Sequence, residues 1–406
     1  MNAADTAFVL ISAALVMFMT PGLALFYAGL VRAKNVLSSI MHSFFMLALA
    51  TVLWVIVCYS LSFGTDIGGI IGGLNFAFLN GVGMEGNGPV SNIPHLAFMI
   101  FQCMFAVITP ALISGAFAER ITFRGFALFS GLWLIFVYSP MCHWVWGGGW
   151  MAKMGALDFA GGAVVHMSSG AAALAAAMVL GPRKGHGQQA FIPHNLPMTL
   201  TGMGILWFGW FGFNAGSALA ANGLAANAFV TTHVATAAAC LSWLVVEKLH
   251  AGKPTTLGAA SGALAGLVAI TPAAGFVTPM AALAIGAVAG VVCFGGVLMK
   301  NHLRYDDALD VVGIHGVGGT WGALATGLFA CKAVNEAGNN GLFYGNPGQL
   351  WIQFVSVLAT WVFCFGVSWV LFKLVDVTVG LRASAEDEVK GLDVSQHSEA
   401  GYQQLS

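Results

Sequence analysis

The chain has 406 residues, of which 58% are hydrophobic and only 8% are charged. Because soluble domains usually carry about 25% charged residues, this composition excludes an ordinary soluble globular protein and indicates that lipid covers most of the surface. The formal net charge is −1. The sequence has no basic patch of the kind that nucleic-acid-binding proteins show, so we expect no nucleic-acid partner.

The charged residues are separated by gaps long enough to cross a membrane, which takes roughly 20 apolar residues. Two of these gaps, 190–246 and 254–299, hold two helices each, because they are interrupted at 220–226 and 271–279. The last gap opens with a loop, so only 349–372 crosses. The full set of charge-free windows is 7–31, 36–62, 90–118, 125–152, 159–182, 190–246, 254–299, 311–331 and 337–372. We therefore predict an all-α membrane domain of eleven transmembrane helices over residues 1–372.

Basic residues predict the orientation, because cytoplasmic loops are enriched in Lys and Arg. With eleven crossings, one set of loops holds only Lys153 and Lys332. The other set and the tail hold the remaining thirteen: Arg32, Lys34, Arg120, Arg124, Arg183, Lys184, Lys248, Lys253, Lys300, Arg304, Lys373, Arg382 and Lys390. This asymmetry predicts that the N-terminus lies outside the cell and the C-terminus in the cytoplasm.

Residues 373–406 follow the last predicted helix as a polar, largely acidic tail. The tail is too short for a second folded domain, and we expect it in the cytoplasm. All seven cysteines fall inside or at the ends of predicted helices, without the spacing of a metal site or a disulfide framework. We therefore expect no metal and no other cofactor.

Two short similarities indicate an internal repeat. The sequence Ile-Thr-Pro-Ala ends the third predicted helix at 108–111 and the eighth at 270–273. Asp158 precedes His166 in the fifth helix, as Asp310 precedes His315 in the tenth. Both similarities link helices five apart, so the two halves would have opposite orientations. This is typical of an inverted repeat with a transport path between the halves.

Ionisable residues inside a membrane are rare and usually functional. If the halves are related by a pseudo-twofold axis, His166 and His315 meet near the centre, where neutral imidazoles can both donate and accept hydrogen bonds. The alternative is a pair of buried histidines that only ties helices together. For Asp158 and Asp310, capping of a helix N-terminus is favoured over direct binding of a cation. Trp144, Trp146 and Trp150 form a cluster in the sequence that could hold an ammonium-like ion by cation–π contacts.

The run from Asp158 to His166 resembles the signature of the Amt/MEP ammonium transporters, which are relatives of the Rh proteins. The resemblance covers nearly the whole chain and includes Ala-Glu-Arg-Ile at 118–121, Trp-Gly-Gly-Gly at 146–149, Pro-His-Asn-Leu-Pro at 193–197, the run 209–217 and the run 310–319. It implies eleven helices in an inverted five-plus-five repeat, assembled as a homotrimer with one pore per subunit. It also implies a multi-pass protein of the inner cell membrane that serves nitrogen uptake and is not an enzyme.

The resemblance also implies roles for individual residues. Trp146, Phe101, Phe105 and Ser217 would bind ammonium at the outer side, and Phe105 and Phe213 would form a stacked gate below them. His166 and His315 would line the pore, and Asp158 would support the site. In the tail, Gly391-Leu392-Asp393 is similar to a family motif, which implies a contact with a PII signal protein at the cytoplasmic face.

We therefore expect transport of ammonium and methylammonium. The alternatives are an Rh-type gas channel, an ammonium sensor and a bis-histidine haem or metal protein. Trp146 with Ser217 argues against the first, the short tail against the second, and the lack of a carboxylate–histidine cluster against the third. The sequence leaves open whether the ion itself crosses or ammonia with a separate proton.

Overall fold

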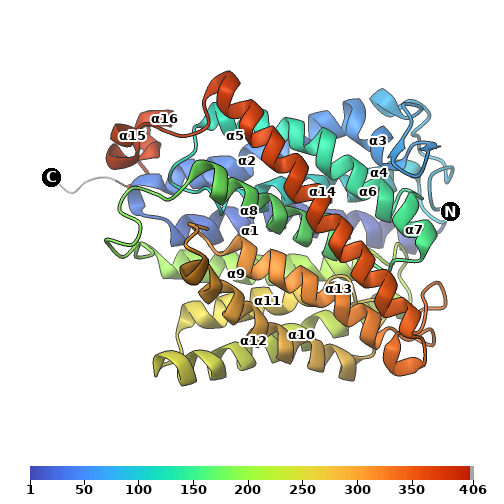
Figure 1. Ribbon diagram of the computed structural model, residues 1–406. Helices are drawn as coiled ribbons and strands as arrows, with labels where there is room; N and C mark the ends of the chain where they lie inside the picture. Colours follow the sequence, from blue (N-terminus) through green and yellow to red (C-terminus); the bar gives the residue numbers. More distant parts are fainter. Residues whose placement is uncertain (403–406) are drawn as a thin grey trace.

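The computed structural model describes residues 1–402, and the last four residues of the predicted tail lie outside this range. Figure 1 shows a bundle of long helices that run in roughly the same direction, with α14 crossing the bundle diagonally. The N-terminus lies at one end of the bundle, and the tail helices α15 (Ala385–Lys390) and α16 (Leu392–His397) lie at the other. The two ends of the described chain are therefore separated by the length of the helices.

Nine helices within residues 1–402 are long and apolar enough to cross a membrane. Some of them contain a 3₁₀ or π-helical segment, labelled η. In chain order the nine are α1 (Ala3–Leu30); η1 (Ala33–Asn35) with α2 (Val36–Leu53), η2 (Trp54–Cys58) and α3 (Tyr59–Phe63); α4 (His95–Ile113); α5 (Phe123–Trp133) with η4 (Leu134–Tyr138), α6 (Ser139–Val145) and α7 (Trp150–Met154); η5 (Gly162–Met167) with α8 (Ser168–Leu180); α9 (Leu196–Gly216); α10 (Gly223–Ala251); α12 (Pro279–Leu303); and α14 (Pro347–Val379).

The other two predicted crossings also coincide with helices, but these are shorter. They are α11 (Thr256–Ile270) and α13 (Val317–Phe329), the latter preceded by the π-helical η6 (Val312–Gly316). The predicted interruptions at 220–226 and 271–279 are confirmed, because α9 and α11 end before them. The count of eleven crossings and their orientation stay predictions.

The remaining elements are short and lie between the helices. They are β1 (Asp66–Ile67) and β2 (Ile71–Gly72), which pair antiparallel with Asp66 opposite Gly72, and the 3₁₀ turns η3 (Ala77–Leu79) and η7 (Leu342–Tyr344). The last long helix continues past the predicted end at 372 and stops at Val379, where Gly380 has a φ of 76°. The polar residues after 372 therefore begin within a helix.

Side-chain caps explain where several helices begin. A capping oxygen satisfies a backbone N–H that the first turn leaves free. Such caps begin α1, α5, α9, α10, α11, α12 and α15, and they are supplied by Asn2, Thr122, Asn195, Asn222, Thr255, Thr278 and Ser384. Local sequence thus fixes the helix starts on both sides of the bundle.

The two predicted halves interlock through the segments that precede η5 and η6. The N–H of Phe159, ahead of η5, donates to the carbonyl of Pro272, after α11, at 3.0 Å. In the corresponding place, the N–H of Leu309, ahead of η6, donates to the carbonyl of Gly115, after α4, at 3.1 Å. A segment within or just after the repeated Ile-Thr-Pro-Ala sequence of each half therefore holds the residues that lead into the histidine-bearing segment of the other half.

Candidate functional site

The two histidines that the sequence singles out lie next to each other. His166 is in η5 and His315 is in η6, and each is only 1% exposed. Their Nδ1 atoms are 3.2 Å apart, and the ring planes meet at 28°. π-Helical segments are rare and occur often at functional sites, and here both histidines lie in one. Among residues 1–402, no group of three or more His, Cys, Asp or Glu side chains is arranged to hold a metal ion.

Glycines allow the helix formed by η5 and α8 to approach the helix formed by η6 and α13 closely enough for this contact. A Cβ atom on Gly170 would lie 2.3 Å from the Cα of Gly316, so the two backbones touch directly. A Cβ on Gly319 would lie 3.1 Å from the Cβ of His166. Larger residues at these positions would push the helices apart, as expected for small-residue packing in membranes.

Two phenylalanines stack next to the histidine pair. The rings of Phe105 and Phe213 have centroids 4.3 Å apart and an interplanar angle of 36°. Phe213 is also stacked on His166, at 6.1 Å and 25°, so the phenylalanines and histidines form one continuous series of rings. Phe105 and Phe213 are each 1% exposed, so both rings are buried.

The outer residues named by the resemblance meet at the other side of Phe105. The ring of Phe101 lies 5.0 Å from that of Phe105, and the indole of Trp146 lies 5.8 Å from it at 84°. Trp146 Nε1 donates to the carbonyl of Asp158 at 2.9 Å, and Ser217 Oγ donates to the carbonyl of Phe213 at 2.8 Å. Because both hydrogens are used, the indole face and the lone pairs of the hydroxyl remain to attract a cation.

The three tryptophans of the predicted cluster do not act as one group. Trp144 donates its Nε1 hydrogen to the carbonyl of Ile70 at 2.8 Å, and its ring packs on Trp150 and Phe363. Trp146 instead contacts Phe105, as described above. Trp144 and Trp150 therefore make packing contacts, and their part in a cation site stays a prediction.

Asp158 holds the start of η5. Its two carboxylate oxygens accept the backbone N–H groups of Gly161, Gly162, Ala163 and Val164, at 2.8, 2.6, 2.7 and 3.4 Å. These four N–H groups occupy lone pairs of both carboxylate oxygens. These contacts are those of a capping residue rather than of a cation ligand.

The counterpart of Asp158 in the second half is Asp307, and the sequence-based pairing with Asp310 is wrong. Asp307 precedes His315 by the same eight positions that separate Asp158 from His166. Asp307 Oδ2 accepts the N–H of Val312 at 2.7 Å and so caps η6. Asp310 instead forms an ion pair with Lys300. The spacing of eight is present in the sequence, whereas Asp310 lies only five positions before His315.

A very small enclosed cavity lies beside the histidine pair. Its volume is about 10 Å³, and His166 is the only ionisable residue among its lining. The other walls are formed by Met19, Leu23, Ile108, Leu112, Val165, Leu206, Trp210, Phe213 and Leu264. A cavity of this size holds about one water molecule.

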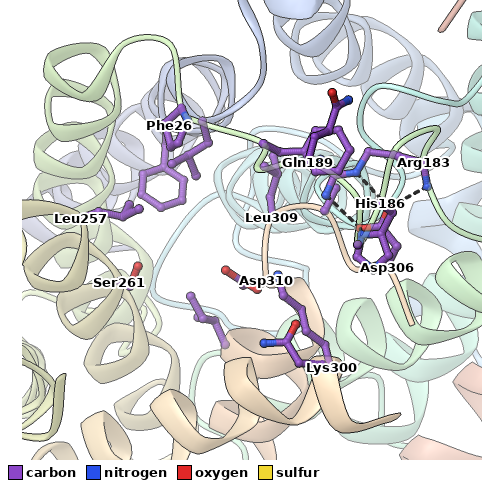
Figure 2. Close-up of a pocket in the computed structure, with 17 residues that line it drawn as sticks. Phe26, Arg183, His186, Gln189, Leu257, Ser261, Lys300, Asp306, Leu309 and Asp310 are labelled. Carbon is purple, nitrogen blue, oxygen red and sulfur yellow. Dashed lines mark hydrogen bonds and ion pairs between the residues drawn. The ribbon is translucent and has the colours of Figure 1, made fainter. Parts of the chain in front are cut away.

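A larger cavity of about 410 Å³ opens on the side of the tail. Figure 2 shows Arg183, His186 and Asp306 on one wall, and Phe26, Leu257 and Ser261 across from them. Asp306 accepts from Arg183 at 2.8–2.9 Å, and Arg183 also donates to Glu119 at 3.0 Å. None of these residues is among the predicted site residues; for Lys300 and Asp306, the dense charge at 300–310 is the signal in the sequence.

A family model, described as Ammonium Transporter Family, matches residues 7–402. The chain belongs to the ammonium transporter family. Among its relatives, the ammonium transporter of Bacillus subtilis is 54% identical over 404 residues and 99% of each chain. Ammonium transporter Amt1 of Archaeoglobus fulgidus is 50% identical over 99% of this chain and 100% of its own.

Solved structures of this family have the same fold. The crystal structure of Saccharomyces cerevisiae Mep2 matches with a TM-score of 0.90 at 36% identity, and the match covers 95% of this chain and 88% of Mep2. A protein described as a sensor Amt protein also matches with a TM-score of 0.90, at 30% identity over 97% of this chain and 98% of its own. The predicted fold class, an all-helical membrane protein of this family, is confirmed.

The tail of this ammonium transporter family member is packed against the end of the bundle at which α2 begins. Asp393 accepts the N–H groups of Leu37 and Ser38 at 3.0 and 2.8 Å, and so caps α2. The N–H of Leu392 donates to the side chain of Asn35 at 2.9 Å, and the Leu392 side chain is fully buried. Val394, in contrast, is 42% exposed.

Glu388, an acidic group of the tail, contacts both the tail itself and one basic loop. Glu388 forms an ion pair with Arg382 of the tail itself, at 2.7 Å, and accepts the N–H of Lys184 at 3.1 Å. Arg120 and Arg183 instead bind Asp306. The basic loop residues therefore divide between the tail and the wall of the cytoplasmic cavity.

Proposed function

We propose that this member of the ammonium transporter family carries ammonium, and also methylammonium, across a cell membrane. Family membership and the close relative named as an ammonium transporter support the substrate. The single observation that carries the mechanism is the buried pair of His166 and His315 behind the stacked rings of Phe105 and Phe213. No other described part of the chain combines buried imidazoles with an aromatic barrier in this way.

Recruitment of the cation is assigned to Trp146, Phe101, Phe105 and Ser217. The aromatic faces attract a cation by roughly 0.5–2 kcal/mol. The Ser217 hydroxyl already donates its hydrogen to the Phe213 carbonyl, so it offers lone pairs to an N–H donor. Ammonium can donate such a hydrogen bond and K⁺ cannot, which gives the site a basis for discrimination between the two ions.

Passage beyond the Phe105 and Phe213 gate requires loss of the charge. The cavity beside His166 is apolar and holds about one water, and an unpaired charge in such surroundings is strongly disfavoured. We therefore assign deprotonation to the gate. Ammonia then crosses the apolar path, and the proton moves along His166 and His315. Asp158 supports this site by holding η5 in place.

The assembly and its control belong to the same proposal. We expect a homotrimer in the inner cell membrane, with a membrane domain over residues 1–372 and a regulatory tail over 373–406 that contacts a PII signal protein. The packing of Leu392 and Asp393 on α2 supports an ordered tail. The exposed apolar side chains of α10, α12 and α14 support a lipid bilayer around the chain.

The experiment is measurement of charge displacement when ammonium is added to liposomes that contain the purified protein. We expect transient currents with ammonium and with methylammonium, and none with K⁺ at the same concentration. Liposomes without protein serve as the control. Charge displacement that does not depend on ammonium, or currents of equal size with K⁺, would refute the proposed function.

A further inference from the structure

The two capping carboxylates of the repeat are placed alike but bonded differently. Asp158 and Asp307 each lie eight positions before a histidine of the pair, and each accepts, at 2.7 Å, the N–H five residues further on. Both oxygens of Asp158 are used by four backbone N–H groups. Asp307 Oδ1, in contrast, is buried and has no hydrogen-bond partner among the described residues. The repeat is therefore asymmetric at its carboxylates.

An unpaired oxygen on a buried carboxylate is unfavourable while the group is charged, and protonation or a water molecule relieves it. Asp307 is 1% exposed. Burial raises the pKa of its carboxyl group to about 6, with Lys300 acting against this rise and Asp310 adding to it. A group of this kind takes up and releases a proton within the physiological pH range.

The charged and titratable groups around Asp307 come from several elements. Lys300, on α12, donates to the main-chain carbonyl of Asp307 at 3.1 Å and to the Asp310 carboxylate. Tyr27 of α1, Tyr305 and Arg120 also lie within electrostatic range. The Tyr27 hydroxyl donates to the carbonyl of Leu112 at 2.9 Å, so it does not supply the missing partner.

Asp307 lies one layer behind the wall of the cytoplasmic cavity. Its chain neighbours Asp306, Ala308, Leu309 and Asp310 line that cavity, as does Lys300, whereas the Asp307 side chain does not. Figure 2 shows Lys300 and Asp310 at this wall. Ile314, which precedes His315, lines the same cavity. The loop of Asp307 and the segment that carries His315 therefore both border this cavity.

We propose that Asp307 is the group that releases the transported proton from the histidine pair into the cytoplasmic cavity. This inference rests on the proposed function. The proton that ammonium loses at the gate reaches Asp307 through water, where an O–H bond forms on Oδ1 and the carboxylate becomes neutral. That bond breaks when the proton passes to water in the cavity, which restores the carboxylate, and ammonia regains a proton in the cytoplasm.

The test varies the pH on the cytoplasmic side of liposome-reconstituted protein while the outer pH is fixed, and records initial ammonium-driven charge displacement. In the wild type, the charge displacement should fall about tenfold for each pH unit below the pKa of Asp307, because the fraction of carboxylate able to accept a proton falls by that factor. Asp307→Asn keeps the acceptor for the Val312 N–H but cannot take up a proton. It should reduce the current severalfold and remove this dependence on cytoplasmic pH.

Two matched variants separate Asp307 from its neighbours. Asp310→Asn makes the same change three residues away on the cavity wall, and His186→Gln removes the histidine that lies 3.4 Å from Asp306. His186→Gln should keep the cytoplasmic-pH dependence, and Asp310→Asn should keep it with a lower midpoint, because the Asp310 charge adds to the rise in the Asp307 pKa. Every variant meets the same gradients, so a change in driving force affects all equally. A wild-type profile in Asp307→Asn, or its loss in His186→Gln instead, would overturn the proposal.

A second measurement decides the question if Asp307→Asn does not fold. Infrared difference spectra of the wild type, titrated between about pH 5 and about pH 8, should show one buried carboxylic acid that loses its proton with a midpoint near the Asp307 pKa. A spectrum without such a carboxyl group would overturn the proposal. If the wild type itself gave no ammonium current, the proposed function would fail. If the wild type gave a current and Asp307→Asn kept the same dependence on cytoplasmic pH, only this inference would fail.

Discussion

The Nδ1 atoms of His166 and His315 lie 3.2 Å apart, which fixes how hydrogens are distributed between the two rings. A hydrogen bond between two ring nitrogens needs one donor and one acceptor, so in a neutral pair only one histidine carries its hydrogen on Nδ1. The other carries it on Nε2. The pair is therefore asymmetric at every instant, and exchange of the two arrangements requires a proton to move between the rings.

Replacement of Trp146 by Leu should weaken recruitment of the cation. Loss of a cation–π contact worth roughly 0.5–2 kcal/mol raises the half-saturating ammonium concentration by about 2- to 30-fold. Ammonium titrations of the charge displacement would measure the change. Trp144→Leu is the matched control, since Trp144 bonds Ile70 and packs on Phe363, and it should keep the wild-type half-saturation. An unshifted titration for Trp146→Leu would exclude this residue from the outer site.

Replacement of Asp158 by Ala should destabilise the protein as well as stop transport. The change leaves four backbone N–H groups at the start of η5 without an acceptor, and each buried unpaired group costs about 1–3 kcal/mol. We expect a clearly lower unfolding temperature in detergent. Asp158→Asn keeps one acceptor oxygen, so its unfolding temperature should lie between those of the wild type and of Asp158→Ala. If Asp158→Ala melted like the wild type, the capping contacts would have no weight in stability.

Titration of the Asp306 carboxyl group should make the stability of the protein depend on pH in the acidic range. Burial alone would raise its pKa, but hydrogen bonds from Arg183 and the charges of Arg120 and Arg183 hold the pKa of this carboxyl well below its usual range. Its stabilising contribution is therefore complete above the unfolded value of about 3.9 and is lost as the pH falls below that value. Asp306→Asn should lower the free energy of unfolding by about 3 kcal/mol at neutral pH.

Melting curves at several pH values would measure both effects. Asp306→Asn should lose part of the acid sensitivity of the wild type, because the titrating group is gone. An unchanged dependence on pH in this variant would show that other carboxyl groups cause the acid sensitivity. His186→Gln is the control, since it keeps the contacts between Asp306 and Arg183 intact.

Replacement of Asp393 by Ala should release the tail from α2. The variant loses two hydrogen bonds to the start of α2, so tail residues 380–402 should become more accessible to protease and to hydrogen exchange. If the tail controls the pore mouth, the same variant should change ammonium currents or weaken binding of a PII protein. Val394→Ala, on the exposed neighbour, should alter neither. A released tail with wild-type transport and PII binding would make the tail a passive extension.

Much of the fold could be predicted from the sequence because lipid imposes simple rules. Charge-free windows gave the helices, and the interruptions at 220–226 and 271–279 agree with the ends of α9 and α11. The end of α14 was missed, since Lys373 and Asp376 signal the end of the membrane but do not end the helix. Hydropathy indicates which part of the chain lipid surrounds, whereas the helix ends depend on residues such as Gly380.

The site was predicted less completely, for reasons of contact geometry. The histidine pair and the phenylalanine stack lie where the sequence and the family resemblance indicated. The pairing of Asp158 with Asp310 was wrong, because only the hydrogen bond to Val312 shows that Asp307 is the cap. The network of Glu119, Arg183 and Asp306 joins three loops that are far apart in sequence. No local sequence pattern therefore predicts it.

The most direct test of the central claim is the ammonium-driven current of the double variant His166→Ala with His315→Ala in liposomes. The account predicts that this charge displacement disappears or loses its discrimination against K⁺, because no groups remain to carry a proton through the apolar path. The exposed, unrelated His233→Ala serves as the control and should conduct as the wild type does. Wild-type current together with wild-type exclusion of K⁺ in the double variant would contradict the claim that the histidine pair carries the proton.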